Sequence, residues 1–357
     1  MIAPQSVDEL KAVIAAEKRV LAVGNRTKQP LSRCPDARLV SLRCLRGIVE
    51  YEPSEFTFTA RAGTPVTDVA ASLSQRRQYL PFDPMLADAG ATIGGTVAGG
   101  MSGPGRFRYG GIRDFLLGVQ FISGDGSLIN AGGKVVKNAA GFDIPKFLVG
   151  SLGRLGAMTE LTFKVFPGPI ATQTLRVECV SIAQAIDRMA AAASSRWEID
   201  AIDYRVNQQS IFLRVAGPQR VNDAIANEIR SMWGEDVSVW EFADDFWRSV
   251  RELNWSPESP IAVKVPCSPG QLARLYDSFA GGDDDQLHWS VAGNVLWVLL
   301  RDEEPLTALD QRLQLLEMPG LVVRGSSDRP LIGKWKSSEM ESALKSAMDP
   351  PAKFPSF

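Results

Sequence analysis

Apolar and polar positions alternate in short runs through the first half of the chain, and this pattern predicts mixed helix and sheet. Ser6 is a typical N-cap residue, helical spacing follows it, and Glu9 completes a capping box. A second helix is predicted at 65–77, with Pro65 in its first turn, and a third at 142–149. Strands are predicted at 19–23, 39–41, 47–51, 57–62 and 158–166. Residues 116–123 and 127–131 are predicted to pair as a hairpin.

Pro167-Gly168-Pro169 ends this first pattern, so we place a domain boundary at residue 168. Beyond it, strands are predicted at 173–179, 201–206 and 210–215, alternating with helices at 182–193 and 218–233. This order is typical of a ferredoxin-like β-α-β-β-α-β unit. We therefore predict an α+β fold with a first domain at 1–168, a cap domain at 169–330 and a segment 331–357 that returns to the first domain. No internal repeat is visible.

Composition narrows the possible functions. The 357 residues are 45% hydrophobic and 22% charged, with a net charge of -2, which gives no support to a nucleic-acid partner. The chain has no apolar run near 20 residues, and its first residues lack the basic and apolar regions of a signal peptide. We therefore expect a cytoplasmic protein. The four cysteines form no close pair, so neither a Cys-x-x-Cys motif nor an iron–sulfur cluster is encoded.

Nine glycines lie between Gly90 and Gly111, in a stretch with few charges. So many glycines suit a backbone that passes close to a flat or charged ligand. We interpret the block 84–114 as a wall around a cofactor; the alternative is a mobile surface loop. A G-x-G-x-x-G dinucleotide fingerprint and a Walker A loop are both missing. Instead, the amide-rich turn from Gly24 to Lys28 follows the first strand. With the later Gly-rich segments it could hold a pyrophosphate through backbone N–H groups, and Arg26 and Lys28 would add positive charge.

An ordered set of short motifs then indicates a family. The chain resembles the FAD-binding domain of the vanillyl-alcohol oxidase type, in its D-2-hydroxyacid branch, and most closely the family of FAD-binding E subunits of glycolate oxidase. The resemblance spans residues 3–167 and continues weakly to Leu344-Lys345 and Asp349-Pro350. It rests on Gly63-Thr64-Pro65, Asp83-Pro84, Thr92-Ile93-Gly94-Gly95, Ala98, Ser102, Tyr109-Gly110, Arg113-Asp114, Leu117-Gly118, Asp125-Gly126, Lys137-Asn138, Gly141-Phe142-Asp143 and the run from Gly150 to Gly156.

The resemblance implies FAD as cofactor and assigns residues to it. Gly24, Asn25, Arg26, Thr27 and Lys28 match the pyrophosphate loop. The segment along the flavin and pyrophosphate is matched by Pro84, Thr92, Gly94, Gly95, Ala98 and Ser102. Gly153 and Gly156 match a turn near the adenine or ribityl group, although Ala98 and Gly156 have packing as an alternative role. We expect non-covalent FAD, because no His or Cys stands at the family's attachment positions.

The segment from His288 to Trp297 resembles the place where the family's hydroxyacid dehydrogenases carry a metal-binding His-rich sequence. Here Gly293-Asn294 is kept, but Ser290 and Trp297 replace the flanking imidazoles. A single His cannot assemble a divalent metal site, so we predict no metal. We expect His288 to be an ordinary polar residue rather than a catalytic base, and we assign no catalytic residue. Arg251 and Lys264 resemble the family's substrate-carboxylate pair; solvated charges are the alternative.

These implications predict an oxidoreductase acting on the CH-OH group of 2-hydroxy acids. The first hypothesis is the FAD subunit of a glycolate oxidase or dehydrogenase complex that makes glyoxylate. Its expected partners are a homologous FAD subunit and an iron–sulfur subunit that accepts the electrons. Such a chain would be cytoplasmic, or peripheral at the inner face of the cell membrane through its partners. The alternatives are a self-sufficient D-2-hydroxyacid dehydrogenase of the D-lactate type and a non-catalytic FAD-binding scaffold.

Overall fold

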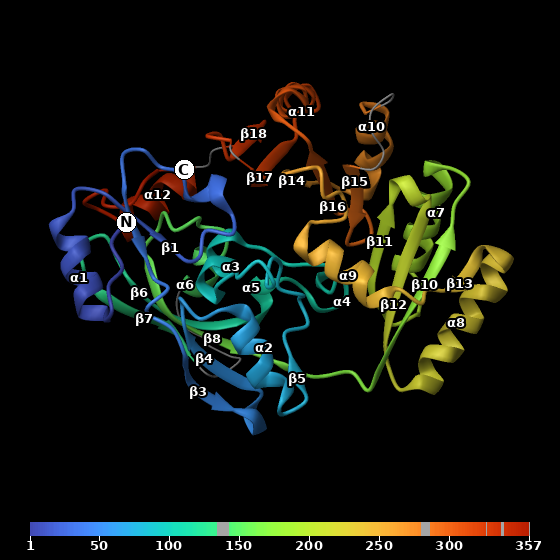
Figure 1. The fold of residues 1–357 in the computed structure, drawn as a ribbon, viewed down its shortest axis with the longest axis horizontal. Coiled ribbons are helices and arrows are strands. Elements are labelled where there is room, and N and C mark those ends of the chain that lie inside the picture. The colour runs from blue at the N-terminus through green and yellow to red at the C-terminus, as the bar shows by residue number, and fades with distance from the viewer. Residues whose placement is uncertain (134–142, 280–285, 326, 337–338, 357) are drawn as a thin grey trace. The chain divides into compact units, whose positions relative to one another are not determined.

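The computed structural model describes residues 1–133, 143–279, 286–325, 327–336 and 339–356. The predicted motif residues Lys137-Asn138 and Gly141-Phe142, and the start of the helix predicted at 142, lie outside these ranges. The chain divides into two compact units (Figure 1). Unit 1 comprises Met1–Ser102, Gly111–Gly168 and Lys336–Phe357, and unit 2 comprises Gly103–Gly110 and Pro169–Trp335. The sequence did not predict that residues 103–110 group with unit 2, nor that this unit extends to Trp335.

Unit 1 begins with helix α1 (Val7–Ala16) and a parallel strand pair, β1 (Val20–Val23) and β2 (Arg38–Ser41). The predicted N-cap is present, because the Ser6 hydroxyl accepts a hydrogen bond from the Glu9 amide. The predicted capping box is incomplete, because the Glu9 side chain does not accept a hydrogen bond from the amide of the N-cap residue Ser6. The Glu9 carboxylate accepts from the Gln5 amide, one residue before the N-cap, at 2.8 Å. Either bond satisfies an amide at the helix start, which no intrahelical carbonyl can reach.

A five-stranded antiparallel sheet forms the centre of unit 1. Its strand order is β3 (Ile48–Glu52), β4 (Thr57–Arg61), β8 (Ala157–Lys164), β6 (Leu116–Ile122) and β7 (Leu128–Gly132). A short pair, β5 (Gln78–Tyr79) and β9 (Phe166–Pro167), lies apart from it. The helices are α2 (Val66–Ser74), α3 (Ile93–Gly99), α5 (Ile112–Phe115), α6 (Ile144–Leu148) and α12 (Glu339–Met348). Phe58 and Phe163, stacked at 5.6 Å, lie in the buried core beside this sheet.

Unit 2 contains the predicted ferredoxin-like alternation. Its elements are β10 (Ala171–Glu178), α7 (Ile182–Ala193), β11 (Ile199–Arg205), β12 (Ser210–Gly217), α8 (Gln219–Trp233) and β13 (Val237–Val239). The strands lie in the order β13-β10-β12-β11, so the first and third strands of the motif occupy the centre. The helices α4 (Arg106–Tyr109) and α9 (Ala243–Glu252) also belong to this unit.

A second ferredoxin-like half follows, which the sequence did not reveal. It consists of β14 (Ile261–Pro266), α10 (Leu272–Asp277), β15 (Leu287–Ser290), β16 (Val295–Leu300), α11 (Glu303–Leu315) and β17 (Pro319–Arg324), with β18 (Leu331–Gly333) added at the edge. Its order, β15-β16-β14-β17, is the first half's order read from the opposite edge. Pairing of β11 with β15 joins the halves into one nine-stranded sheet. Unit 2 therefore contains the same topology twice, although its sequence shows no visible repeat.

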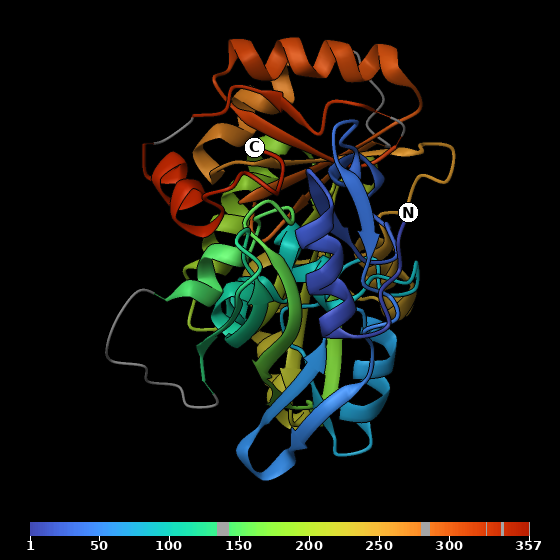
Figure 2. The same cartoon turned by 90° about the vertical axis from the view of Figure 1, so that its left-hand side faces the viewer.

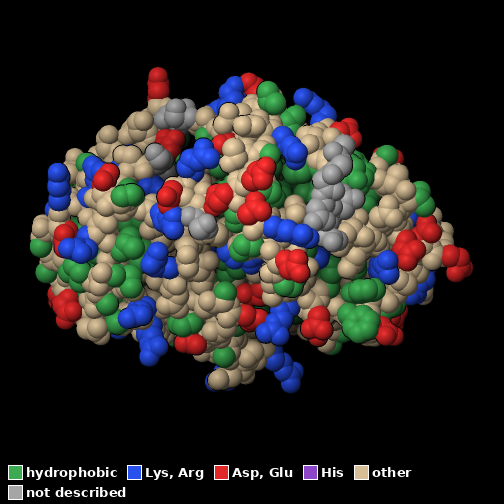
Figure 3. All heavy atoms as spheres, turned by 45° about the horizontal axis from the view of Figure 1, so that its top comes forward, with side chains coloured by type: hydrophobic (Ala, Val, Ile, Leu, Met, Phe, Trp, Pro, Cys, Tyr) green, Lys and Arg blue, Asp and Glu red, His purple; other side chains and the backbone are tan. Residues whose placement is uncertain are grey.

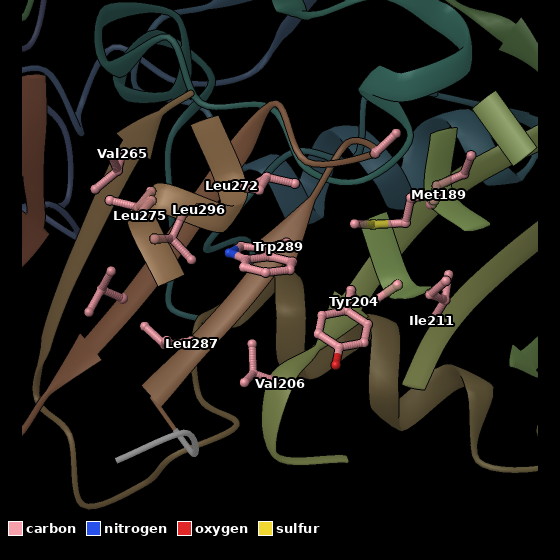
Figure 4. Close-up of a cluster of buried hydrophobic side chains, with 14 of the residues drawn as sticks. Met189, Tyr204, Val206, Ile211, Val265, Leu272, Leu275, Leu287, Trp289 and Leu296 are labelled. Atoms are coloured by element: carbon pink, nitrogen blue, oxygen red, sulfur yellow. The ribbon is translucent and has the colours of Figure 1, made fainter. Parts of the chain in front are cut away.

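One apolar core spans both halves of unit 2. Figure 4 shows side chains from both halves within it, among them Tyr204 on β11 and Trp289 on β15. These two rings stack at 5.3 Å across the strand pair that joins the halves. Leu306, Leu309 and Leu313 on α11 close the same core, and Figure 2 shows this helix lying across the strands of the second half. On the face drawn in Figure 3, side chains of both charges are interspersed, in agreement with the small net charge.

Candidate functional site

A cavity with about 470 Å³ of empty space lies in unit 1 between the loop that follows β1 and helix α3. The predicted residues Gly24, Asn25, Arg26, Thr27, Lys28, Thr92, Gly95 and Ala98 all line it. Residues about 70 positions apart in the sequence are thus brought together as two facing walls.

The loop after β1 is held tightly against the start of α3. A Cβ atom on Gly24 would lie 2.2 Å from the Thr92 hydroxyl oxygen, so only glycine fits this approach. Asn25 ties the loop to the Gly-rich block by donating to the Gly90 carbonyl at 2.8 Å. Arg26 has a φ of 57°, and its buried Nε atom has no hydrogen-bond partner. Since buried donors are nearly always paired, Arg26 is suited to an anionic ligand at this position.

Lys28 adds a second cation to the same wall. Only 6% of its surface is exposed, and its stem lies 3.0 Å from where a Cβ atom on Gly99 would stand. Its ammonium donates to the Thr27 hydroxyl at 3.2 Å. Because glycine has no side chain, Gly99 leaves room for the aliphatic part of Lys28 along the last turn of α3.

Two adjacent glycines on α3 have different roles. Gly94 donates its amide to the Ala62 carbonyl at 2.9 Å, and a Cβ atom there would lie 2.7 Å from the Ala62 Cβ. It therefore allows α3 to pack directly against the end of β4. A Cβ atom on Gly95 would meet only the Thr92 hydroxyl, at 3.0 Å, and Gly95 lines the cavity. Gly94 thus serves packing as well as the cavity, whereas Gly95 mainly keeps the cavity open.

A second cavity of about 330 Å³ continues along α3, and here the turn at 150–156 forms part of the wall. Gly153 takes a φ of 73°, a conformation that favours glycine. A Cβ atom on Gly156 would lie 2.8 Å from the Phe121 ring, so Gly156 also packs against β6. Both cavities are lined by Ala22, Val23, Gly24, Thr92, Gly95 and Ala98. The second also has Gly94, Gly153 and Gly156 in its wall.

Two predicted cofactor residues lie outside both cavities. Pro84 is half-buried in the loop between β5 and α3. Ser102 is buried, and its hydroxyl accepts a hydrogen bond from the Ile112 amide at 2.9 Å. Conversely, sequence reasoning missed a set of mainly apolar wall residues, because nothing in their type or spacing marks a ligand: Leu21, Ala22, Val23, Leu31, Ser32, Leu42, Ala62, Gly99, Leu152 and Met158.

The predicted substrate residues both lie in unit 2. Arg251 is half-buried in the last turn of α9. Lys264 lies on β14 between Val263 and Val265, which belong to the apolar core; side chains alternate along a strand, so Lys264 points to the opposite face. Burial and the nearby charge of Arg106 lower the pKa of Lys264 to about 8. Arg106, in the Gly-rich block, is therefore a neighbouring cation that the sequence did not indicate.

On the same face, register aligns Lys264 with Trp297, Trp297 with His288, and His288 with Arg205 across four strands. His288 is fully buried. Its Nε2 atom lies 2.7 Å from the Asp203 carboxylate, and its Nδ1 atom accepts a hydrogen bond from Arg205 Nε at 3.0 Å. Because arginine can only donate, Nδ1 is unprotonated and Nε2 carries the proton. Burial and the Arg205 charge lower the pKa of His288 to about 4, so the ring is neutral.

Asp203 completes this cluster by accepting from the Ser290 hydroxyl at 2.9 Å and the Val291 amide at 3.2 Å. Neither His288 nitrogen is left to bind a metal or a substrate. In the described part of the chain, no group of three or more His, Cys, Asp or Glu residues is arranged to hold a metal ion. Sequence reasoning missed Asp203 and Arg205, although charged residues in an otherwise apolar strand were a usable signal.

Comparisons with known proteins agree with this geometry. Residues 1–132 match the model of a family described as FAD binding domain. The chain is 36% identical over 246 residues to the glycolate oxidase subunit GlcE of Escherichia coli (strain K12), covering 69% of this chain and 67% of that one. The chain belongs to the family of the glycolate oxidase subunit GlcE. Its cofactor is FAD.

More distant relatives extend the picture. The glycolate oxidase subunit GlcD of Bacillus subtilis (strain 168) is 32% identical over 181 residues, but the match covers only 38% of that protein and 49% of this chain. The structure of an alkyldihydroxyacetonephosphate synthase has a TM-score of 0.70 at 15% identity, covering 98% of this chain and 75% of that one. That likeness shows the fold alone; together with the family model it supports the predicted α+β fold with an FAD-binding domain of the vanillyl-alcohol oxidase type. Among the described helices, none is both long and apolar enough to cross a membrane.

Proposed function

We propose that this chain is the FAD-binding subunit of a glycolate oxidase or dehydrogenase complex, in which glycolate is oxidised to glyoxylate. The observation that supports this most is the joint cavity wall formed by the 24–28 loop, α3 and the 150–156 turn, in a chain whose relative GlcE is a glycolate oxidase subunit. Relatives named D-lactate dehydrogenase and D-2-hydroxyglutarate dehydrogenase support the wider class of 2-hydroxyacid oxidation.

The residues of unit 1 fit FAD on chemical grounds. The unpaired Nε of Arg26 and the ammonium of Lys28 would bind the pyrophosphate, together with backbone amides of the 24–28 loop. The backbone at Gly95 and Ala98 would lie along the cofactor, and Gly153 and Gly156 would approach its adenine or ribityl side. Contributions from Pro84 and Ser102 stay predictions, because these residues lie outside both cavities.

We further propose that the cofactor is held without a covalent bond. The residues that line the two cavities include neither His nor Cys, the side chains that most often form such links in this family. His288, the only histidine of the chain, belongs to unit 2, where both of its ring nitrogens are hydrogen-bonded.

When bound, FAD would supply the acceptor for the hydride that leaves the α-carbon of the hydroxyacid. Lys264, with Arg251 or with the neighbouring Arg106, would bind the substrate carboxylate. The hydroxyl proton needs a base, and His288 is poorly suited to that role, because Asp203 and Arg205 already occupy its ring. We therefore assign the chain no catalytic base of its own.

That last point favours a second candidate, in which the chain is a non-catalytic FAD-binding scaffold subunit and turnover takes place only with a catalytic partner. The partners we propose are a homologous FAD subunit and an iron–sulfur subunit, since the four cysteines of this chain include no cluster motif. The names of the relatives, subunits GlcE and GlcD, are consistent with an assembly of several chains.

The decisive experiment mixes the purified FAD-loaded chain with glycolate in the absence of oxygen while the flavin absorbance is followed. Bleaching at a rate compatible with turnover supports a catalytic subunit. A flavin that stays oxidised with the chain alone, and bleaches once partner subunits are added, supports the second candidate. No bleaching in the full assembly contradicts both.

A further inference from the structure

The C-terminal segment 345–356 is bonded to the turn that forms part of the cofactor-cavity wall. It begins at Lys345, in the last turn of α12 (red in Figure 1), and this lysine makes the main contacts. The Lys345 ammonium donates to the Arg154 carbonyl at 2.7 Å, the Phe354 carbonyl at 2.9 Å and the Asp349 carboxylate at 2.6 Å. An ammonium has three N–H donors, so each has an acceptor.

Asp349 makes this arrangement rigid. It is 3% exposed, and its carboxylate also accepts from the main-chain amides of Lys353 and Phe354, both at 2.8 Å. The Phe354 ring is buried at 1% exposure. Together, the ion pair and these amides fold residues 345–354 into one tight loop.

A second bond runs in the opposite direction. The Arg154 guanidinium donates from Nη1 to the Ser356 carbonyl at 2.7 Å, so the turn and the C-terminal segment each use a cation, buried Arg154 and half-buried Lys345, to bind the other's backbone. Arg154 is 7% exposed, and burial lowers its pKa. Hydrogen bonds from buried charged groups are among the stronger ones in proteins, so this pair of bonds fixes the position of residue 154.

The other side of the same turn is bonded to α3. The amides of Gly150 and Leu152 donate to the carbonyls of Val97 and Ala98, at 2.9 and 2.8 Å. Leu152 has a φ of 53°, which is unfavourable for a residue with a side chain and must be maintained by its surroundings. The turn therefore lies between α3, with its cofactor wall, and the C-terminal segment, while Leu152 and Gly153 line the cavities.

The C-terminal segment also reaches the opposite wall. The Lys353 carbonyl accepts from the amide of Val20, the first residue of β1, at 2.8 Å. The Lys353 ammonium donates to the carbonyls of Ala15 and Glu17 at the end of α1, at 3.1 and 2.6 Å. The main chain of the segment is thus bonded to β1, which leads into the 24–28 loop. The Lys353 side chain is instead bonded to the end of α1, where neither Ala15 nor Glu17 lines a cavity.

We infer that Lys345 and Asp349 are positioning residues for the cofactor, which hold the 150–156 turn in the conformation that FAD requires. The inference rests on the proposed FAD site in unit 1. It assigns to the end of the chain a role in cofactor affinity, although none of its residues lines either cavity.

The test compares two substitutions in the purified FAD-loaded chain, Lys345→Met and Lys353→Met. Both remove a half-buried ammonium from the same segment, but of the two ammonium groups only that of Lys345 is bonded to the cavity-wall turn. Lys345→Met is expected to weaken FAD binding about tenfold or more, measured by flavin fluorescence on dilution. It should also speed hydrogen exchange of the Gly150 and Leu152 amides. Lys353→Met is expected to lower the thermal stability of the apoprotein while FAD affinity changes less than about threefold.

Equal FAD affinity in the wild type and Lys345→Met, or an equal loss in both variants, would overturn the inference. If Lys345→Met does not fold, Arg154→Gln replaces it, since this change removes the guanidinium that binds the Ser356 carbonyl and leaves the Lys345–Asp349 pair intact. It should weaken FAD binding several-fold, and unchanged affinity overturns the inference as well. Failure of the wild-type chain to bind FAD is a distinct result, which refutes the proposed cofactor site itself.

Discussion

Arg205 donates a hydrogen bond to the Nδ1 atom of His288 at 3.0 Å, across the strand pair that joins the two ferredoxin-like halves of unit 2. A neutral imidazole is thereby held between a cation and the carboxylate of Asp203. The Arg205 guanidinium also lies 4.7 Å from the Trp255 ring. Because β11 and β15 share only a short register, this buried polar cluster helps to specify how the halves pair.

The first prediction concerns pH and His288. Folding lowers the pKa of His288 from 6.5 to about 4, so the unfolded chain takes up a proton first as the pH falls. The stability that the neutral ring contributes is fully present above pH 6.5 and is lost between pH 6.5 and 4. At about 1.4 kcal/mol per pH unit, the loss is about 3 kcal/mol. Urea unfolding measures the free energy of unfolding of the wild type and of His288→Gln. The difference between the two should therefore shrink by about 3 kcal/mol between pH 7 and pH 4.

The matched control for this experiment is Ser290→Ala, which removes one hydrogen bond to Asp203 and keeps the ring. The free energy of unfolding of this variant should lie about 1 kcal/mol below that of the wild type, and this difference should stay nearly constant over the same pH range. A His288→Gln gap that does not narrow would mean that the native imidazole is charged, contrary to the donor assignment made from Arg205.

The second prediction separates two neighbouring glycines. Gly95→Val should give soluble protein with little FAD, because the new side chain enters both cavities while its Cβ meets only the Thr92 hydroxyl. Gly94→Ala should instead lower thermal stability even in the apoprotein, since its Cβ would lie 2.8 Å from the Ala62 carbonyl oxygen. Flavin content and apoprotein melting temperature are the two measurements. Full flavin content in Gly95→Val would show that this part of α3 is not the cofactor wall.

Much of unit 1 was predictable because its motifs depend on local chemistry. Ser6 caps α1, Gly124-Asp125-Gly126 turns the β6–β7 hairpin, and the part of the Gly-rich block between residues 92 and 99 contributes to the lining of the cavities. The second ferredoxin-like half was not predicted. Its place in one sheet with the first half depends on the pairing of β11 with β15, which lie far apart in the sequence. Apolar wall residues such as Leu42 and Met158 were missed for a related reason: in sequence they are indistinguishable from core residues.

The third prediction is that the flavin is released by acid. Neither cavity presents a His or Cys side chain to form a covalent link. Precipitation of the yellow protein with trichloroacetic acid should leave the flavin in the supernatant, where its absorbance can be measured. Yellow colour that remains with the washed pellet would contradict non-covalent binding.

The fourth prediction concerns Lys264, whose pKa is lowered to about 8 by burial and by Arg106. The lysine is charged below this pH and becomes neutral above it, so binding of a carboxylate should weaken as the pH rises through 8. Oxalate, which has no α-hydrogen to lose, serves as the probe. Its dissociation constant, measured by isothermal titration calorimetry, should rise up to about tenfold per pH unit above 8.

Two variants test this assignment. Lys264→Met should bind oxalate weakly, with no change between pH 7 and 9. Arg251→Met keeps Lys264, so any weakening that it causes should leave the pH profile in place. Lys264 would not belong to the proposed carboxylate site if the dissociation constant of oxalate for the wild type did not change through pH 8. The same conclusion would follow if the pH dependence of this constant were unchanged in Lys264→Met.

The last prediction is that the chain alone oxidises glycolate poorly or not at all. Both ring nitrogens of its only histidine are hydrogen-bonded, and Ser290 is bonded to Asp203. Without a base, the hydroxyl proton has no good acceptor, and positioned proton transfer contributes about 10²–10⁴-fold to rates. Steady-state assays of the isolated chain with glycolate and D-lactate, using an artificial dye as acceptor, should therefore give turnover far below the typical ~10 s⁻¹ of enzymes. Addition of the proposed flavoprotein and iron–sulfur partners should restore it. Turnover near ~10 s⁻¹ by the chain alone would instead identify a self-sufficient 2-hydroxyacid dehydrogenase whose base lies outside the His288 cluster.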